Sequence, residues 1–282
     1  MQKIIQLNLA LLLVFVSVQT HAMSLYFEKP ESEIRVGDTV ILHAYLDTGN
    51  VEINGIEGTV KVNGPVSVQN LSVAGSVFSL WPNKPSLSGE EISFVGGSPS
   101  GVFGKKNKAF SIIFRATEIG KINFSVKIAD VFLNDGKGTR LAVVGANETV
   151  EVLAAGKEVK NELSDLIVND KTLPNPFKIE LGQDANIAAG KYFISFYATD
   201  DASGINRYEV RENNLPAVRS GNTYVLEDQS LKGVVEVKAI DNAGNFRIET
   251  IELKEKKSNL ILLIGALILI ILAALYFKFK KK

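Results

Sequence analysis

The sequence predicts an all-β protein with two β-sandwich modules in series and one C-terminal transmembrane helix. Three observations lead to this fold class. Short runs rich in Val, Ile, Phe and Thr recur between clusters of Gly, Asn, Asp and Pro, as in sandwich proteins. A polar, strand-poor stretch at 154–162 divides these runs into two sets. An unbroken apolar segment occupies 260–277 near the end of the chain.

Length and composition already exclude several classes of protein. A chain of 282 residues has room for one large domain or two ordinary ones. It contains no cysteine, which excludes disulfides, thiolate zinc sites, iron–sulfur clusters and a cysteine nucleophile. The two histidines, His21 and His43, cannot form a His-rich metal site, and no HExxH motif occurs. A hydrophobic content of 46% is typical of a folded chain rather than a disordered one.

The N-terminus has the features of a secretory signal peptide at 1–22. Lys3 supplies the positive start, 9–16 supplies a short apolar core, and small residues precede a cleavage point after Ala22. The apolar run is too short to span a bilayer comfortably, which favours a cleaved signal over an N-terminal anchor.

The apolar segment at 260–277 predicts a transmembrane helix. Its 18 residues would cover ~27 Å as a helix, close to the thickness of the hydrocarbon core. Tyr276 suits the membrane interface, and the lysine-rich tail at 278–282 indicates the cytoplasmic side. We therefore expect a single-pass protein of the cell membrane with an extracellular or periplasmic ectodomain.

The charge of this ectodomain argues against a nucleic-acid partner. Removal of Lys3 and the four tail lysines leaves 26 basic residues against 31 acidic residues. A net charge of about −5 provides no general attraction for phosphate backbones.

The first module is expected at 23–153. Its runs alternate apolar and polar residues over four to seven positions and end at turn-forming residues. The strands expected here are 40–46, 56–62, 92–95, 110–114, 122–126 and 149–152.

A linker at 154–175 is expected to separate this module from a second one at 176–254. The second module is short, and its strand runs fit a small immunoglobulin-like sandwich. Its expected strands are 192–197, 208–211, 234–239 and 247–251.

Six segments of the first module follow one another in a distinctive order: RVGDT at 35–39, INGIEGTV at 53–60, GSVFSLW at 75–81, ISFVGG at 92–97, AFSIIFRA at 109–116 and VFLNDGKGT at 131–139. In these segments and their order the module resembles the cohesin domain, the receptor-like β-sandwich of bacterial and archaeal scaffold proteins. The resemblance implies a nine-stranded jelly roll that binds a dockerin, a small calcium-loaded helical module, or sometimes a polysaccharide. It implies no catalysis.

One segment departs from the family pattern. The loop after the second long strand reads Val62-Asn63-Gly64-Pro65-Val66, without the usual Tyr/Phe-Asp-Pro. This departure favours a divergent, non-cellulosomal member. The second module is similar to bacterial immunoglobulin-like or fibronectin-like repeats through ATDDASGI at 198–205 and AIDNAGN at 239–245. That class is broad and indicates a spacer.

The strand at 56–62 supplies the candidate partner-binding residues. Alternation places its even-numbered residues toward the core and Glu57, Thr59 and Lys61 outward. In the cohesin family an outward face of this kind contacts dockerin, so the resemblance implies a partner-binding role for these three. A plain solvated face is the alternative.

The acidic turns of the second module allow two interpretations. Asp200, Asp201, Asp241, Asn242 and Asn245 offer hard oxygen donors that could meet and hold calcium. The same residue types also close hairpins without any metal, and no EF-hand spacing is present. We favour the turns, assign no metal or cofactor, and leave calcium binding by the region of Asp200, Asp201 and Asp241 open.

The sequence contains no convincing set of catalytic residues. A Ser-His-Asp triad would need His43, which alternation places on an outward strand face, and no GxSxG motif occurs. With 31 Asp and Glu residues, the chain has enough carboxylates for a catalytic pair of the kind that glycosidases use. Small sandwiches, however, rarely provide the deep cleft that a glycosidase needs. Trp81 is the single tryptophan, too little for the aromatic stripe of a sugar-binding face. We expect no enzyme.

These patterns lead to two functional hypotheses. The first is a membrane-anchored attachment or scaffold protein whose cohesin-like domain binds a dockerin-like module without a covalent bond. The second is a carbohydrate-binding adhesin that holds extracellular polysaccharide, linked to polysaccharide catabolism.

Overall fold

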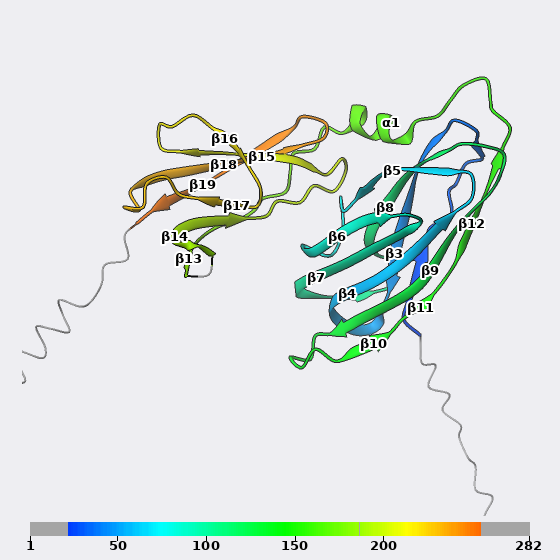
Figure 1. Ribbon diagram of the computed structural model, residues 1–282, viewed down its shortest axis with the longest axis horizontal. Coiled ribbons are helices and arrows are strands. Elements are labelled where there is room, and N and C mark those ends of the chain that lie inside the picture. The colour runs from blue at the N-terminus through cyan, green and yellow to red at the C-terminus, as the bar shows by residue number, and fades with distance from the viewer. Residues whose placement is uncertain (1–21, 186, 255–282) are drawn as a thin grey trace, which may run out of the picture. The chain divides into compact units, whose positions relative to one another are not determined.

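The computed structural model describes residues 22–254 except 186 (Figure 1). The signal peptide expected at 1–22, apart from Ala22, lies outside the described residues, as do the expected span at 260–277 and the tail at 278–282. Among the helices within 22–254, none is long and apolar enough to cross a membrane.

The chain divides into two compact units between Leu163 and Ser164. Both are built almost wholly from β-strands, as the sequence predicts. Each expected strand lies within an observed one, except that the run at 192–197 extends one residue past its strand.

The first unit contains two sheets. The five-stranded sheet has the order β11-β1-β3-β8-β5. All its pairings are antiparallel except that of β1 with β11. Its strands are β1 (Ser24–Phe27), β3 (Thr39–Asp47), β5 (Val66–Ser72), β8 (Asn107–Ala116) and β11 (Val144–Gly145).

The seven-stranded sheet has the order β2-β12-β9-β4-β7-β6, with β10 paired to β9. Long neighbouring strands β9, β4 and β7 form its centre, as Figure 1 shows. Its strands are β2 (Ile34–Arg35), β4 (Gly49–Asn63), β6 (Leu80–Ser88), β7 (Glu91–Gly104), β9 (Gly120–Leu133), β10 (Arg140–Ala142) and β12 (Glu148–Leu153).

Phenylalanines pack the two sheets of this unit against each other. Phe110 and Phe114 of β8 meet Phe94 of β7 and Phe124 of β9, with ring centroids 4.8 Å and 5.3 Å apart. All four side chains are at most 1% exposed. Since full burial of such a side chain stabilises by roughly 1.5–3 kcal/mol, these pairs anchor the sandwich.

Gly58 of β4 lies under one of these rings. A Cβ at Gly58 would approach Phe94 Cζ to 2.8 Å and the carbonyl oxygen of Ile128 to 2.7 Å. Only glycine therefore lets the ring and the neighbouring strand lie this close to the β4 backbone.

The second unit pairs a three-stranded sheet, β13-β14-β17, with a four-stranded sheet, β16-β15-β18-β19. Apolar side chains of both sheets form one core, which includes Phe196, Tyr208 and Val237. The strands are β13 (Ile179–Asp184), β14 (Ile187–Phe196), β15 (Ile205–Glu212), β16 (Val218–Ser220), β17 (Thr223–Val225), β18 (Gly233–Asp241) and β19 (Phe246–Leu253).

The stretch expected to be a linker contains a short helix, α1 (Glu162–Asn169). Asp170 follows it directly, and the Asp170 amide donates to the carbonyl of Leu166, which completes the last turn. Eight residues are too few for helical periodicity to stand out in the sequence.

Candidate functional site

The expected partner-binding residues lie on the outer face of the seven-stranded sheet. Ile56, Val60 and Val62 of β4 are at most 3% exposed and point into the core. Glu57, Thr59 and Lys61 alternate with them and are partly exposed. The orientation predicted from alternation is therefore confirmed; a role in binding stays a prediction.

Strand pairing extends this surface into four rows across β9, β4, β7 and β6, which we call the β4 face. Each row places one outward residue of each strand beside the next. The rows are Phe132, Gly55, Gly97 and Leu80; Asp130, Glu57, Val95 and Asn83; Ile128, Thr59, Ser93 and Ser86; and Ser125, Lys61, Glu91 and Ser88.

Several charged side chains on and beside the β4 face form ion pairs. Arg140 of β10 lies 2.7 Å from Glu57 and 2.8 Å from Asp130, so one guanidinium bridges two acids that would otherwise repel each other. Lys61 pairs with Glu90 at 3.1 Å. Because each of these charges has an oppositely charged neighbour and the five groups together carry a net charge of only −1, they would add orientation to a contact more than net attraction.

Apolar side chains stand between these charges. Ile128 is 58% exposed beside Thr59, and Leu80 is 50% exposed at the sheet edge. The Phe132 ring packs over Gly55, where a Cβ would come within 3.3 Å of it. The face thus carries exposed aliphatic side chains on its two outer strands, β9 and β6, beside ion-paired charges, and protein-binding surfaces combine the same two kinds of group.

Trp81 of β6 is a packing residue. Its ring covers Gly96, lies 6.0 Å from the Phe78 ring and packs against the core. Its indole N–H donates to the carbonyl of Phe78 at 2.9 Å. With its ring against the core and its donor satisfied, Trp81 is poorly placed to stack on a sugar.

His43 of β3 lies 2.8 Å, at Nδ1, from the hydroxyl of Ser111. Burial, followed by the positive charge of Lys108, lowers the pKa of His43 to about 4. The imidazole is therefore neutral near pH 7. Ser111 is 2% exposed inside β8, so a substrate could not reach its hydroxyl. The pair offers no nucleophilic centre.

An open cleft of about 590 Å³ lies beside β2 and β12. Its acidic residues are Glu31, Glu33 and Glu151, all exposed, and Glu33 pairs with Arg35 at 2.8 Å. Acid–base catalysis by carboxylates usually depends on burial to separate their roles. The cleft does not provide that environment.

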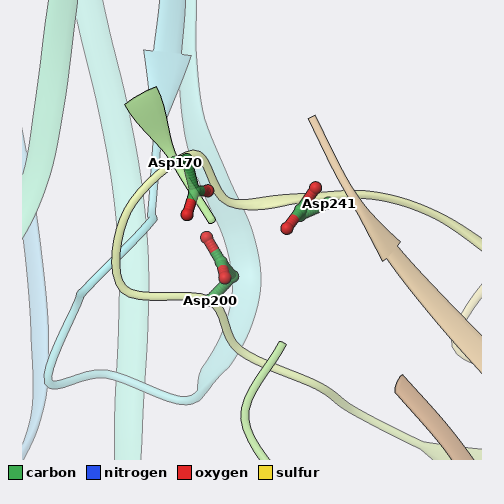
Figure 2. Close-up of side chains that lie close together, drawn as sticks. All are labelled: Asp170, Asp200 and Asp241. Atoms are coloured by element: carbon green, nitrogen blue, oxygen red, sulfur yellow. The ribbon is translucent and has the colours of Figure 1, made fainter. Parts of the chain in front are cut away.

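Three acidic side chains meet at one end of the second unit. Asp170 follows α1, Asp200 follows β14, and Asp241 ends β18. Each is at most 5% exposed, and one carboxylate oxygen from each lies within 4.8 Å of the other two. Figure 2 shows the three carboxylates facing a common space.

Hydrogen bonds satisfy five of the six carboxylate oxygens in this group. Thr172 and Ser203 donate to Asp170, Gly204 and Ala202 donate to Asp200 Oδ1, and Asn245 donates to both oxygens of Asp241. Asp200 Oδ2 is buried and has no partner. Burial raises the pKa of Asp200, and the charges of Asp170 and Asp241 add to that rise.

The structure brings together only some of the residues that the sequence singled out. Asp200 and Asp241 join the group, whereas Asp201 accepts a hydrogen bond from Asn175 and is exposed. Asn242 and Asn245 act through their amide groups as donors to neighbouring oxygens. Asp170 was missed because it lies in the stretch interpreted as a linker.

Comparisons with known proteins give structural similarity only. No family model matches the chain. No curated protein matches it either. Solved structures that resemble it are cohesin domains of low sequence identity.

Three of these structures illustrate the range. A non-cellulosomal cohesin from the archaeon Archaeoglobus fulgidus has 14% identity and a TM-score of 0.40, over 47% of this chain and 91% of its own. The seventh ScaB type I cohesin of Pseudobacteroides cellulosolvens has 16% identity and a TM-score of 0.38, over 48% and 94%. A type I cohesin–dockerin complex from Clostridium thermocellum has 12% identity and a TM-score of 0.41, over 48% and 95%.

Proposed function

We propose that the chain is an attachment protein whose β4 face binds a dockerin-like protein module without a covalent bond. The observation that carries this proposal is the make-up of the face. Exposed Ile128 of β9 stands beside Thr59 of β4, and Arg140 pairs with Glu57 and Asp130 in the adjacent row. The cohesin-like sequence of the first module adds the class of partner.

The physical basis of binding would be burial of the exposed aliphatic side chains. Ile128 has more than half of its surface in water, and its removal from water on docking would stabilise the complex by roughly 1–2 kcal/mol. The paired charges of Arg140, Glu57 and Lys61 would select the orientation of the partner, because an unmatched charge against them costs free energy. No bond is made or broken.

We further propose that the signal peptide at 1–22 exports the chain and that the segment at 260–277 holds it in the cell membrane. The partner would then be retained at the extracellular or periplasmic side of that membrane. Docking and anchoring are separate parts of this proposal, and each can fail alone.

The test of docking uses the full-length protein, immobilised in detergent, as bait for a lysate of the source cells with calcium and then with a chelator. We expect a retained protein that contains calcium-binding dockerin loops and is released by the chelator. Ile128→Asp should reduce its retention roughly tenfold or more, since a buried charge replaces an apolar contact. Ile119→Asp is the matched control: Ile119 is 69% exposed but lies between β8 and β9, outside the β4 face.

Equal retention by both variants would refute docking on the β4 face. Capture of polysaccharide, with no protein retained, would favour the second function, carbohydrate adhesion. One observation supports that alternative: on the other sheet, Tyr26 and Tyr45 point outward and stack with centroids 5.9 Å apart. A sugar could pack against this pair once the Lys106 side chain, whose Nζ lies 5.1 Å from the Tyr45 ring centroid, moves aside. Loss of polysaccharide binding in Tyr45→Ala would support it.

A further inference from the structure

Among the described residues, the three buried acids of the second unit have no basic side chain nearby that neutralises their negative charge. Asp170, Asp200 and Asp241 are 5%, 2% and 2% exposed. Within the described part of the chain, no Lys, Arg or His forms an ion pair with any of them. Buried carboxylates in proteins are normally paired, protonated or bound to a metal.

Turn formation accounts for most of this group but leaves one atom unexplained. Asp241 closes its turn through Asn245, and Asp200 Oδ1 accepts the amides of Ala202 and Gly204 at 3.2 Å and 2.7 Å. Asp200 Oδ2 takes no part in the turn and has no hydrogen-bond partner, although it is buried. A buried carboxylate oxygen left without a partner costs several kcal/mol unless a cation or proton compensates for it.

We propose that Asp170, Asp200 and Asp241 together bind one calcium ion. Each carboxylate oxygen has two lone pairs, so the oxygens that accept amide hydrogens can also coordinate a metal. The three contributing oxygens lie within 4.8 Å of one another. Two oxygens at 2.3–2.6 Å from one Ca²⁺ are at most about 5 Å apart, so the observed spacing fits.

The chemistry of the donors selects the class of ion. Carboxylate oxygens are hard ligands that favour Ca²⁺, Mg²⁺ or Mn²⁺ over metals that prefer nitrogen or sulfur. Calcium accepts irregular arrangements of oxygen ligands drawn from loops, whereas Mg²⁺ demands near-octahedral geometry at shorter distances. Three carboxylates from separate loops therefore fit calcium best.

Calcium would join three distant segments of the chain. Asp170 belongs to the segment after α1, Asp200 to the loop between β14 and β15, and Asp241 to the turn between β18 and β19. The hydrogen bonds from Ser203 to Asp170 and from Asn245 to the Asp170 carbonyl already connect these segments. The ion would neutralise their mutual repulsion and stabilise the unit. This role is independent of docking on the β4 face.

The test measures calcium binding by the purified full-length protein after treatment with a chelator. We expect calorimetric titration with CaCl₂ alone to give one ion per chain. At a hundred times Kd, the bound ion should raise the Tm of the second unit by roughly 10–20 °C. Asp200→Asn removes the charge at the unpartnered oxygen with little change of shape, and should weaken calcium binding roughly tenfold or more.

Asp201→Asn is the matched control, because Asp201 is adjacent in sequence but exposed and outside the group. It should bind calcium like the unchanged protein. Ile128→Asp should also bind calcium normally even though it weakens docking, so the two proposals can fail separately. Absence of bound calcium in the unchanged protein would overturn the proposal even if Asp200→Asn fails to fold. An equal calcium response in Asp200→Asn and Asp201→Asn would also overturn it. If Asp200 is instead simply protonated, Asp200→Asn should raise Tm, and calcium should not change the Tm of the unchanged protein. That result would overturn the proposal.

Discussion

Substitution of Gly58 by alanine tests how closely the β4 backbone approaches the sandwich core. The added Cβ would lie 2.7 Å from the Ile128 carbonyl oxygen and 2.8 Å from Phe94 Cζ. Neither atom can move freely, because the carbonyl belongs to the paired strand β9 and the Phe94 ring packs against Phe110 at 4.8 Å. Overpacking of this kind costs about 1–3 kcal/mol.

Part of this cost is offset. Alanine lowers the entropy of the unfolded chain and suits a strand better than glycine by roughly 0.5–1 kcal/mol. We therefore expect Gly58→Ala to reduce the free energy of unfolding by about 1–2 kcal/mol. The matching fall in Tm is about 3–8 °C for a unit of this size.

Gly97→Ala provides the matched control on the neighbouring strand β7. There the nearest atoms to an added Cβ are the Asn54 carbonyl oxygen at 3.5 Å and Leu80 Cβ at 3.8 Å, which are ordinary contacts. This variant should be neutral or slightly stabilised in urea unfolding followed by circular dichroism. Equal stabilities of the two alanine variants would refute the close packing of β4 against Phe94.

Two further predictions concern pH and a buried hydroxyl. Burial lowers the pKa of His43 from 6.5 to about 4 in the folded protein. As the pH falls from 6.5 toward 4, the unfolded chain therefore binds a proton at this residue before the folded chain does. The contribution of His43 to the free energy of unfolding is fully present above pH 6.5 and is lost over this range. Discounted for partial solvation, the loss is about 2 kcal/mol, and His43→Gln should flatten it in urea unfolding at a series of pH values. Tyr208→Phe removes the hydroxyl that accepts the Ala198 amide at 2.8 Å and should cost about 1–3 kcal/mol in the same assay. An unchanged midpoint would show that water replaces the hydroxyl.

The central strands could be predicted from the sequence because their alternation follows burial directly. Buried and partly exposed side chains alternate strictly along β3 from Thr39 to Asp47, because one face of its sheet packs on the core and the other faces solvent. Edge strands carry a weaker signal. β6 contains Pro82 and Pro85, residues that normally argue against a strand, yet it pairs only with β7 and so needs fewer amide donors. β5, Val66–Ser72, lies at the other sheet's edge and is largely polar.

The acidic group was only half predictable for a different reason. Asp200 and Asp241 lie in turn motifs that draw attention to their oxygens. Asp170 lies in a polar stretch, 30 residues or more away from them in sequence, and no local pattern marks it. Hydrogen bonds from the Ser203 amide and the Asn245 side chain hold Asp170 in place. These residues are far from Asp170 in sequence, so the contacts form only when the second unit is folded.

The exposure of Ile128 on the β4 face depends on a β-bulge that alternation alone does not reveal. Opposite Thr59 and Val60 of β4, β9 presents Ile128 and Val126, so one extra residue, Lys127, is inserted into the ladder. Strict alternation from the outward Ser125 would turn Ile128 toward the core. The bulge reverses the phase, which buries Ala129 to 6% exposure and leaves Ile128 at 58%. The same backbone irregularity that interrupts pairing thus supplies the exposed side chain on which the proposed docking depends.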